Sequence, residues 1–219
     1  YIIDWGYPTQ EDRYLTMEDY IQGYIGNAID YIRKAAEVDK VNLLGVCQGG
    51  TFSIIYTSLN PEKINSLVTM VAPIDFSTDD GLLFRWSKYL DIDKMVDAYG
   101  VIPGDFMNNG FLTLKPISLT VGKYLNLIDD LDNPELMENF LRMESWIFDS
   151  PGQAGEAVRQ FIKDLYQENK LVKGTLMIGD QKVNMKNITM PVLNIYGEKD
   201  HIVPPAASKD LKKYVGTKD

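Results

Sequence analysis

Residues 41–50 read VNLLGVCQGG, a short apolar run followed at once by a turn rich in glycine. The run 41–44 is typical of a buried strand, and the apolar segment 51–59 predicts a helix that packs on a sheet. Between them, the pattern Gly-x-Cys-x-Gly places Cys47 where a nucleophile stands in a strand–turn–helix motif. The sequence therefore predicts an α/β fold with a reactive thiol at the end of a strand.

The chemistry of this turn sets requirements on its neighbours. Small residues are expected at Gly45 and Gly49, because a Cβ two positions from the nucleophile would collide with the neighbouring backbone. The turn leaves the backbone amide of Gln48 free to bind an oxyanion. It also places the Cys47 sulfur at a helix N-terminus, where the dipole is expected to lower the thiol pKa. The alternative is that Cys47 is a buried small hydrophobe in a glycine-rich turn.

Regular elements alternate on both sides of the turn. Apolar residues at steps of three and four predict a helix over 20–32, and strands are expected at 64–71 and 191–197. Residues 1–3 are expected to be the end of another buried strand. The alternation of strand and helix indicates a doubly wound, mostly parallel sheet.

A long segment interrupts this alternation. Residues 76–186 are rich in Met and aromatic residues and are expected to form a helical lid or cap inserted between two strands. The core is then expected to consist of residues 1–75 and 187–219. A small hairpin is expected at 174–182.

Asp200 and His201 follow the strand expected at 191–197. In an open α/β sheet, sites assemble at the carboxyl ends of the strands, so the Asp200 carboxylate can orient an imidazole there. The alternative is a turn or N-cap aspartate. Neighbouring side chains on an extended segment point to opposite faces, so Asp200 is not expected to orient His201 toward Cys47.

The order nucleophile, then acid, is that of an α/β-hydrolase fold with a lid insertion, in which the triad histidine comes last. His201 is the single histidine of the chain, so no residue here is expected to be the triad histidine. Because the sequence also opens without Met, we expect a fragment that lacks the first strands and the last strand–helix unit.

The chain has 219 residues, a formal net charge of −9 and one cysteine. The negative charge argues against binding to a nucleic acid backbone. A single cysteine cannot form an internal disulfide and falls short of a Cys-rich zinc site, which favours a reducing, cytoplasmic compartment. The acidic stretches 77–80 and 129–132 lack the spacing of a calcium loop, so no metal site is expected. No apolar run approaches the roughly 20 residues of a membrane-spanning helix.

Several motifs together resemble those of the polyhydroxyalkanoate synthases. They cover most of the chain and are most similar at its two ends. The box Gly45-Val46-Cys47-Gln48-Gly49-Gly50 is most similar to that of the class III enzymes, whose catalytic subunit works with a second, non-homologous subunit. The other motifs are Asp4-Trp5-Gly6-Tyr7-Pro8, Asp19-Tyr20-Ile21, Val68-Thr69-Met70-Val71-Ala72-Pro73-Ile74-Asp75-Phe76 and Asp200-His201-Ile202-Val203-Pro204.

The resemblance implies an acyltransferase that polymerises (R)-3-hydroxyacyl-CoA, typically 3-hydroxybutyryl-CoA, into polyester and releases CoA. Cys47 falls on the family's acylated cysteine and Asp200 on its catalytic aspartate, while His201 matches a histidine outside the triad. The implied partners are the CoA thioester, a second synthase subunit, a second copy of the chain and the surface of a polymer granule. No cofactor is implied, because the CoA thioester is the substrate.

Apolar residues of the insertion, including Phe84, Trp86 and Met95, are then expected to shield the acyl-enzyme from water, with core packing as the alternative for each. Two other functions stay open. A cysteine-dependent hydrolase of the same fold, of the dienelactone hydrolase or thioesterase kind, would release free acid. An inactive segment that binds a partner or granule through its insertion is the non-enzymatic alternative. Without the triad histidine, the 219-residue chain itself is expected to be nearly inactive.

Overall fold

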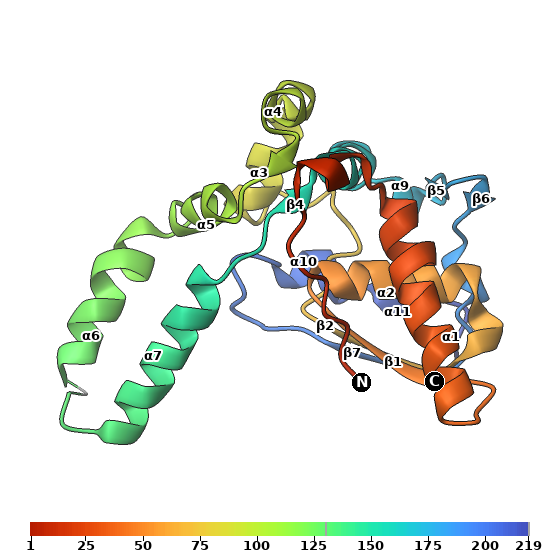
Figure 1. Ribbon diagram of the computed structural model, residues 1–219, viewed down its shortest axis with the longest axis horizontal. Helices are drawn as coiled ribbons and strands as arrows, with labels where there is room; N and C mark the ends of the chain where they lie inside the picture. Colours follow the sequence, from red (N-terminus) through yellow and green to blue (C-terminus); the bar gives the residue numbers. More distant parts are fainter. Residues whose placement is uncertain (130, 219) are drawn as a thin grey trace.

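Three parallel strands form the central sheet of the protein, whose computed structural model describes residues 1–129 and 131–218 (Figure 1). Their order across the sheet is β1-β2-β7, and the bounds are Val41–Val46 for β1, Ile64–Met70 for β2 and Val192–Ile195 for β7. The strands expected at 41–44, 64–71 and 191–197 are therefore confirmed. Because the strands are parallel, their carboxyl ends meet at one edge of the sheet.

Helix α2 (Gln48–Leu59) covers one face of this sheet and begins directly after β1. Its residues from 50 to 58 are all buried, as expected for a helix enclosed in an α/β core. The hydroxyls of Thr57 and Ser58 donate to the carbonyl oxygens of Ser53 and Ile54, at 2.7 and 2.8 Å, so these polar groups are buried without an unmet hydrogen bond.

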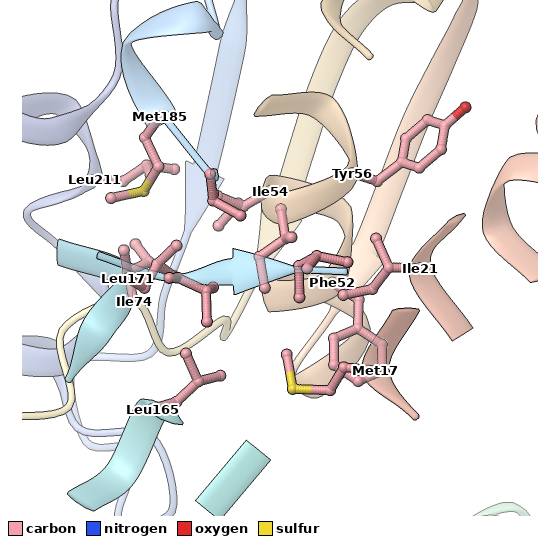
Figure 2. Close-up of a cluster of buried hydrophobic side chains, with 14 of the residues drawn as sticks. Met17, Ile21, Phe52, Ile54, Tyr56, Ile74, Leu165, Leu171, Met185 and Leu211 are labelled. Atoms are coloured by element: carbon pink, nitrogen blue, oxygen red, sulfur yellow. The ribbon is translucent and has the colours of Figure 1, made fainter. Parts of the chain in front are cut away.

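A second helical segment runs beside α2. It consists of a π-helical stretch, η2 (Asp19–Ile25), continued by α1 (Gly26–Ala35). Ile21, Ile25 and Ile29 are buried, which confirms the apolar stripe expected over 20–32. Figure 2 shows the core between these helices and the rest of the chain; its labelled side chains are Met17, Ile21, Phe52, Ile54, Tyr56, Ile74, Leu165, Leu171, Met185 and Leu211.

The opposite face of the sheet is open in the described part of the chain. Leu44 and Leu193 lie in the same row across Val68 and are 58% and 56% exposed. Val46 and Ile195 in the next row are exposed as well. In a doubly wound fold both faces of the sheet carry helices, whereas here this apolar face is exposed.

The segment expected to form the lid is mainly helical. Its elements up to residue 148 are α3 (Leu82–Tyr89), α4 (Ile92–Tyr99), β3 (Val101–Ile102), α5 (Gly104–Leu112), η4 (Ile117–Gly122), α6 (Lys123–Asp129) and α7 (Pro134–Phe148). The elements after residue 148 are β4 (Gln153–Ala154), α8 (Gly155–Gln160), η5 (Phe161–Gln167), α9 (Lys170–Lys173), β5 (Met177–Ile178), β6 (Gln181–Lys182) and η6 (Met185–Asn187). The short segments η1 (Gln10–Tyr14), η3 (Pro61–Lys63), α10 (Pro205–Ser208) and α11 (Leu211–Tyr214) complete the chain.

Helices α5, α6 and α7 form an arm that projects from the body of the molecule (Figure 1). The ammonium of Lys123 binds the Glu144 carboxylate at 2.7 Å, and the rings of Tyr124 and Phe140 are in contact, so α6 and α7 lie side by side. At the base of the arm, β3 and β4 pair antiparallel and bring its two ends together. The later part of the inserted segment behaves differently, because Phe161, Leu165 and Leu171 belong to the same core as the sheet.

The hairpin predicted within residues 174–182 is present, whereas the strand predicted at residues 1–3 is not. The hairpin expected within 174–182 is confirmed, since β5 and β6 pair antiparallel. The strand expected at residues 1–3 is wrong: these residues are irregular, and Tyr1 and Ile2 are 84% and 98% exposed. An apolar triplet has the composition of a strand, but a strand also requires a neighbour to which its backbone can bond, and none of the described residues provides it.

Candidate active site

Cys47 stands on a sharply bent turn between β1 and α2. Its backbone has φ 52° and ψ −122°, a conformation that L-residues rarely adopt. The turn is held from both sides, because the Cys47 N–H donates to the Met70 oxygen at 2.9 Å and its carbonyl accepts from the N–H of Gly50 at 2.9 Å and of Thr51 at 3.1 Å. A strained backbone conformation at a non-glycine residue is expected for a nucleophile that stands between a strand and a helix.

The glycines around the turn have unequal roles. A Cβ on Gly45 would stand 2.4 Å from the Ser53 Oγ and 2.5 Å from the Gly49 oxygen, so Gly45 is sterically required. A Cβ on Gly49 would meet no heavy atom of the described residues within 4 Å. The expected collision at Gly49 is therefore wrong. Gly50 has the close contact instead, since its Cβ would lie 2.5 Å from the Cβ of Ala72.

This difference predicts a contrast in stability. Gly45→Ala should lower the free energy of unfolding by about 1–3 kcal/mol, as overpacking does in a close-packed interior. Gly49→Ala should be neutral or stabilising by up to about 1 kcal/mol, because alanine favours the helix in which residue 49 lies. Urea unfolding of the two variants, followed by circular dichroism, measures both values. Equal destabilisation by the two substitutions would contradict the contact pattern.

Cys47 lies on the wall of a largely apolar cavity of about 330 Å³. Gln48 is one of the polar residues of the same wall, while Trp86 and Met95 line the cavity from the inserted segment. Phe84 does not: it is fully buried and its ring contacts those of Phe76 and Tyr166. Two of the three side chains expected to shield the cysteine thus line its cavity, and the third packs in the core.

Burial raises the pKa of the Cys47 thiol above its ordinary value. A hydrogen bond from the Gln48 backbone N–H to the sulfur lowers the pKa, and the charge of the Asp200 carboxylate raises it. The expectation of a lowered thiol pKa is therefore wrong, because the loss of hydration of the thiolate outweighs the stabilisation at the helix N-terminus. A thiol in this state needs a general base before it can attack.

The raised pKa gives a direct prediction for alkylation. The rate at which iodoacetamide modifies Cys47 should reach its half-maximum at a pH above about 8.5, the value of a free cysteine. Asp200→Asn should move this midpoint down, because it removes a negative charge near the sulfur while the amide oxygen can still accept the turn hydrogen bonds. The pH profile of alkylation, read by mass spectrometry, measures both effects. A midpoint below that of free cysteine would contradict the burial of the thiol.

The sequence allows Asp200 to be either a turn aspartate or a carboxylate that orients an imidazole. Its Oδ1 accepts hydrogen bonds from the backbone N–H groups of Ile202 and Val203, each at 2.9 Å, so it does stabilise a turn after β7. The charge of the same carboxylate raises the pKa of the Cys47 thiol, although Asp200 is not one of the residues that line the cavity. Cys47 follows β1 and Asp200 follows β7, so both stand at the carboxyl edge of the same parallel sheet.

His201 is placed differently. Its Nε2 is buried and has no hydrogen-bond partner among the described residues. Burial lowers the pKa of His201, as does the positive charge of Lys115, and the charge of Asp200 opposes them. Ile202 and Val203 line the cavity of Cys47, but His201 does not. The expectation that His201 is not held toward Cys47 agrees with this placement.

Two further side chains at the cavity had no signal in the sequence. Gln153 donates from its Nε2 to the Oε1 of Gln48 at 3.4 Å, and both glutamines separate the cavity from a second one of about 160 Å³. Tyr166 lines the first cavity from η5. Both lie more than a hundred positions after Cys47, so that only folding places them beside it.

The segment that carries Tyr166 is anchored to the loop that follows β2. Asn169, with φ 51°, accepts from the Phe76 N–H at 3.0 Å and donates to the Asp75 Oδ1 at 2.9 Å. Hydrogen bonds from Ser77, Asn169 and Tyr214 outweigh the effect of partial burial and lower the pKa of Asp75. Asp75 is therefore a charged anchor between the sheet edge and the inserted segment.

None of residues 77–80 lines the cavity of Cys47. In the acidic stretch 77–80, Asp79 pairs with the Lys88 ammonium at 2.6 Å. In the stretch 129–132, residue 130 lies outside the described residues. Within residues 1–129 and 131–218, no helix has the length and apolar character needed to cross a membrane.

The chain is 57% identical over its whole length to the Poly(3-hydroxyalkanoate) polymerase subunit PhaC of Allochromatium vinosum, of which it spans 62%. It is 55% identical, over 98% of its residues, to the protein of the same name from Thiocystis violacea, of which it spans 60%. The chain thus covers about three fifths of the curated relatives it matches, and the resemblance to the polyhydroxyalkanoate synthases is confirmed.

The fold comparison and the family model agree with each other. A solved structure titled for the metagenome-derived lipolytic enzymes LipS and LipT matches 96% of this chain and 64% of its own, with a TM-score of 0.51 and 15% identity, which shows a common fold. The model of the family described as alpha/beta hydrolase fold matches residues 1–218. With a strained cysteine at the turn between strand and helix, the chain belongs to the α/β-hydrolase family.

Proposed function

We propose that the whole protein is an acyltransferase that polymerises (R)-3-hydroxyacyl-CoA, with 3-hydroxybutyryl-CoA as the typical substrate, and releases CoA. One observation carries this proposal: a strained cysteine opens into an apolar cavity of about 330 Å³. The names of the curated relatives support it, since they are polymerases of poly(3-hydroxyalkanoate).

The proposed reaction begins with the thiol of Cys47. An imidazole supplied by the whole protein takes the thiol proton, and the sulfur attacks the thioester carbonyl carbon. The C–S bond to Cys47 forms, the carbonyl electrons move to the oxygen, and the backbone N–H of Gln48 stabilises that oxyanion. When the carbonyl re-forms, the bond to the CoA sulfur breaks and the imidazolium returns the proton to the departing thiolate.

A cysteine suits this chemistry better than a serine would. Exchange of one thioester for another is close to thermoneutral, and the acyl group stays activated for attack by the 3-hydroxyl of the next unit. The apolar lining, including Trp86 and Met95, keeps water from the acyl-enzyme. Asp200 is proposed to orient the imidazole through its second carboxylate oxygen, since the first is bonded to the turn amides.

The proposal extends to where the protein works. We propose that it acts in the cytoplasm at the surface of polymer granules, together with a second subunit and a second copy of itself. The arm supports this, because its helices expose large apolar side chains, among them Ile128, Leu141 and Trp146, which is 73% exposed.

The experiment that tests the function uses the whole protein and 3-hydroxybutyryl-CoA. Free CoA should appear together with a polymer that sediments, and the protein should sediment with it. Soluble 3-hydroxybutyrate without polymer would overturn the proposal in favour of a cysteine-dependent hydrolase of the same fold. The absence of any CoA release would favour a binding module without catalytic activity.

A further inference from the structure

The cavity of Cys47 contains one buried side-chain donor that the proposed reaction has not used. Tyr166 lines the cavity and is only 7% exposed. None of the hydrogen bonds between described side chains involves its hydroxyl, whereas Ser87 Oγ on the same wall donates to the Leu83 oxygen at 2.8 Å and Gln153 donates to Gln48. A side-chain donor on the wall of a ligand-sized cavity is a group that can bind an acceptor of the ligand.

The ring of Tyr166 is held in place on several sides. Its centroid lies 4.7 Å from that of Phe76, 5.0 Å from that of Phe84 and 5.9 Å from that of Phe161. Leu165, the preceding residue, is buried in the main core (Figure 2). Farther along, the bond between Asn169 and Asp75 ties the same segment to the sheet edge. The hydroxyl is therefore preorganised before any substrate binds, as electrostatic stabilisation of a transition state requires.

Tyr166 is also electrostatically coupled to the nucleophile. Burial raises the pKa of Tyr166, and the charge of Cys47 raises it further. The phenol therefore stays protonated, and remains a donor, at neutral pH. When an acyl group is bound to the Cys47 sulfur, its carbonyl oxygen is only two bonds from the sulfur. This oxygen is therefore the acceptor of the substrate that lies nearest to Cys47. The 3-hydroxyl lies farther along the acyl chain.

We propose that the Tyr166 hydroxyl is a catalytic hydrogen-bond donor to the carbonyl oxygen of the acyl thioester and works together with the backbone N–H of Gln48. This rests on the acyl transfer to Cys47 proposed above. While the sulfur attacks and the carbonyl electrons move to the oxygen, the phenol O–H bond stays intact and donates to the oxyanion. The proton of the thiol still travels by way of the imidazole to the departing CoA. Tyr166 thus supplies a side-chain donor where Gln48 supplies a main-chain donor.

The first test is Tyr166→Phe in the whole protein. The kcat of CoA release from 3-hydroxybutyryl-CoA should fall by about 10²- to 10³-fold, as for the loss of one oxyanion donor. KM should stay within about twofold, because the interaction strengthens only in the transition state. Tyr56→Phe is the matched control: the hydroxyl of Tyr56 is buried without a partner among the described residues, and it lies in the core and not at the cavity. That control should leave kcat unchanged.

The outcomes separate this proposal from the function itself. A kcat within about threefold of the unsubstituted protein, or a raised KM with unchanged kcat, would overturn the role of Tyr166. If the unsubstituted protein releases CoA but forms free acid, the polymerase function fails while the role of Tyr166 is still decided by the same rates. If it releases no CoA at all, both proposals fail.

A second variant guards against loss of folding in Tyr166→Phe. Replacement of Tyr166 by 3,5-difluorotyrosine keeps the ring shape and lowers the phenol pKa. Activity should then decline as the pH rises through that lowered pKa, since a phenolate cannot donate. The same replacement at Tyr56 should leave the pH profile unchanged. A profile for the Tyr166 replacement that matches the natural protein would overturn the proposal.

Discussion

Cys47→Ala in the whole protein should reduce the release of CoA from 3-hydroxybutyryl-CoA to the background rate. Loss of the nucleophile of a catalytic triad costs on the order of 10⁶ in kcat. Cys47 is the single cysteine of the chain, so no other thiol within it can take over. The rate of CoA release, measured with a thiol reagent, is compared between the unsubstituted protein and the Cys47→Ala variant. Equal melting temperatures of the two proteins would show that the fold is unchanged.

Cys47→Ser sharpens the same experiment. A hydroxyl fits where the thiol stands, but acyl transfer to it forms an ordinary ester and discards the activation of the thioester. We therefore expect slow release of CoA and little polymer. Full polymer yield from the serine variant would contradict the need for a thioester at residue 47. Retained CoA release from the alanine variant would show that Cys47 is not the nucleophile.

The 219-residue chain alone should release CoA at least about 10³-fold more slowly than the whole protein, because a buried thiol with a raised pKa needs a base. Among the described residues no imidazole lines the cavity, and His201 stands outside the lining. Imidazole added in solution should restore part of the rate, since a cavity of about 330 Å³ can admit so small a base. Single-turnover release of CoA from the two proteins measures the difference.

This comparison needs a control for folding, because the chain exposes an apolar sheet face at Leu44 and Leu193. Slow alkylation of Cys47 in the native chain and fast alkylation in urea would show that the cysteine lies in a folded site. Equal rates of CoA release from the folded chain and the whole protein would contradict the need for an external base.

Much of the fold could be predicted locally. The strands β1, β2 and β7, the helix through Ile21, Ile25 and Ile29, and the hairpin β5-β6 all follow from apolar periodicity and turn residues close together in sequence. The strand expected at residues 1–3 failed because sheet pairing is not a local property. The same triplet that is apolar enough for a strand stays irregular where no strand of the described chain lies beside it.

The site divides in the same way. Sequence spacing alone determined that Cys47 stands between a strand and a helix, and that Asp200 follows a later strand of the same sheet. Parallel strands then bring their carboxyl ends to one edge whatever the length of the insertion between them, which is why the two residues stand at the same edge of the sheet.

Only the tertiary structure decided the chemistry around the sulfur. Burial is the sum of contacts from distant segments, and it raised the thiol pKa that was expected to be lowered. The packing of α2 against Ala72 likewise put the close Cβ contact at Gly50, where the sequence had predicted it at Gly49. The tertiary structure also brought Tyr166 and Gln153 to the cavity, although neither stands in a recognisable motif. Local sequence determines backbone conformation, because its interactions are between neighbours; hydration and hydrogen bonding of a side chain depend on which remote atoms exclude water from it.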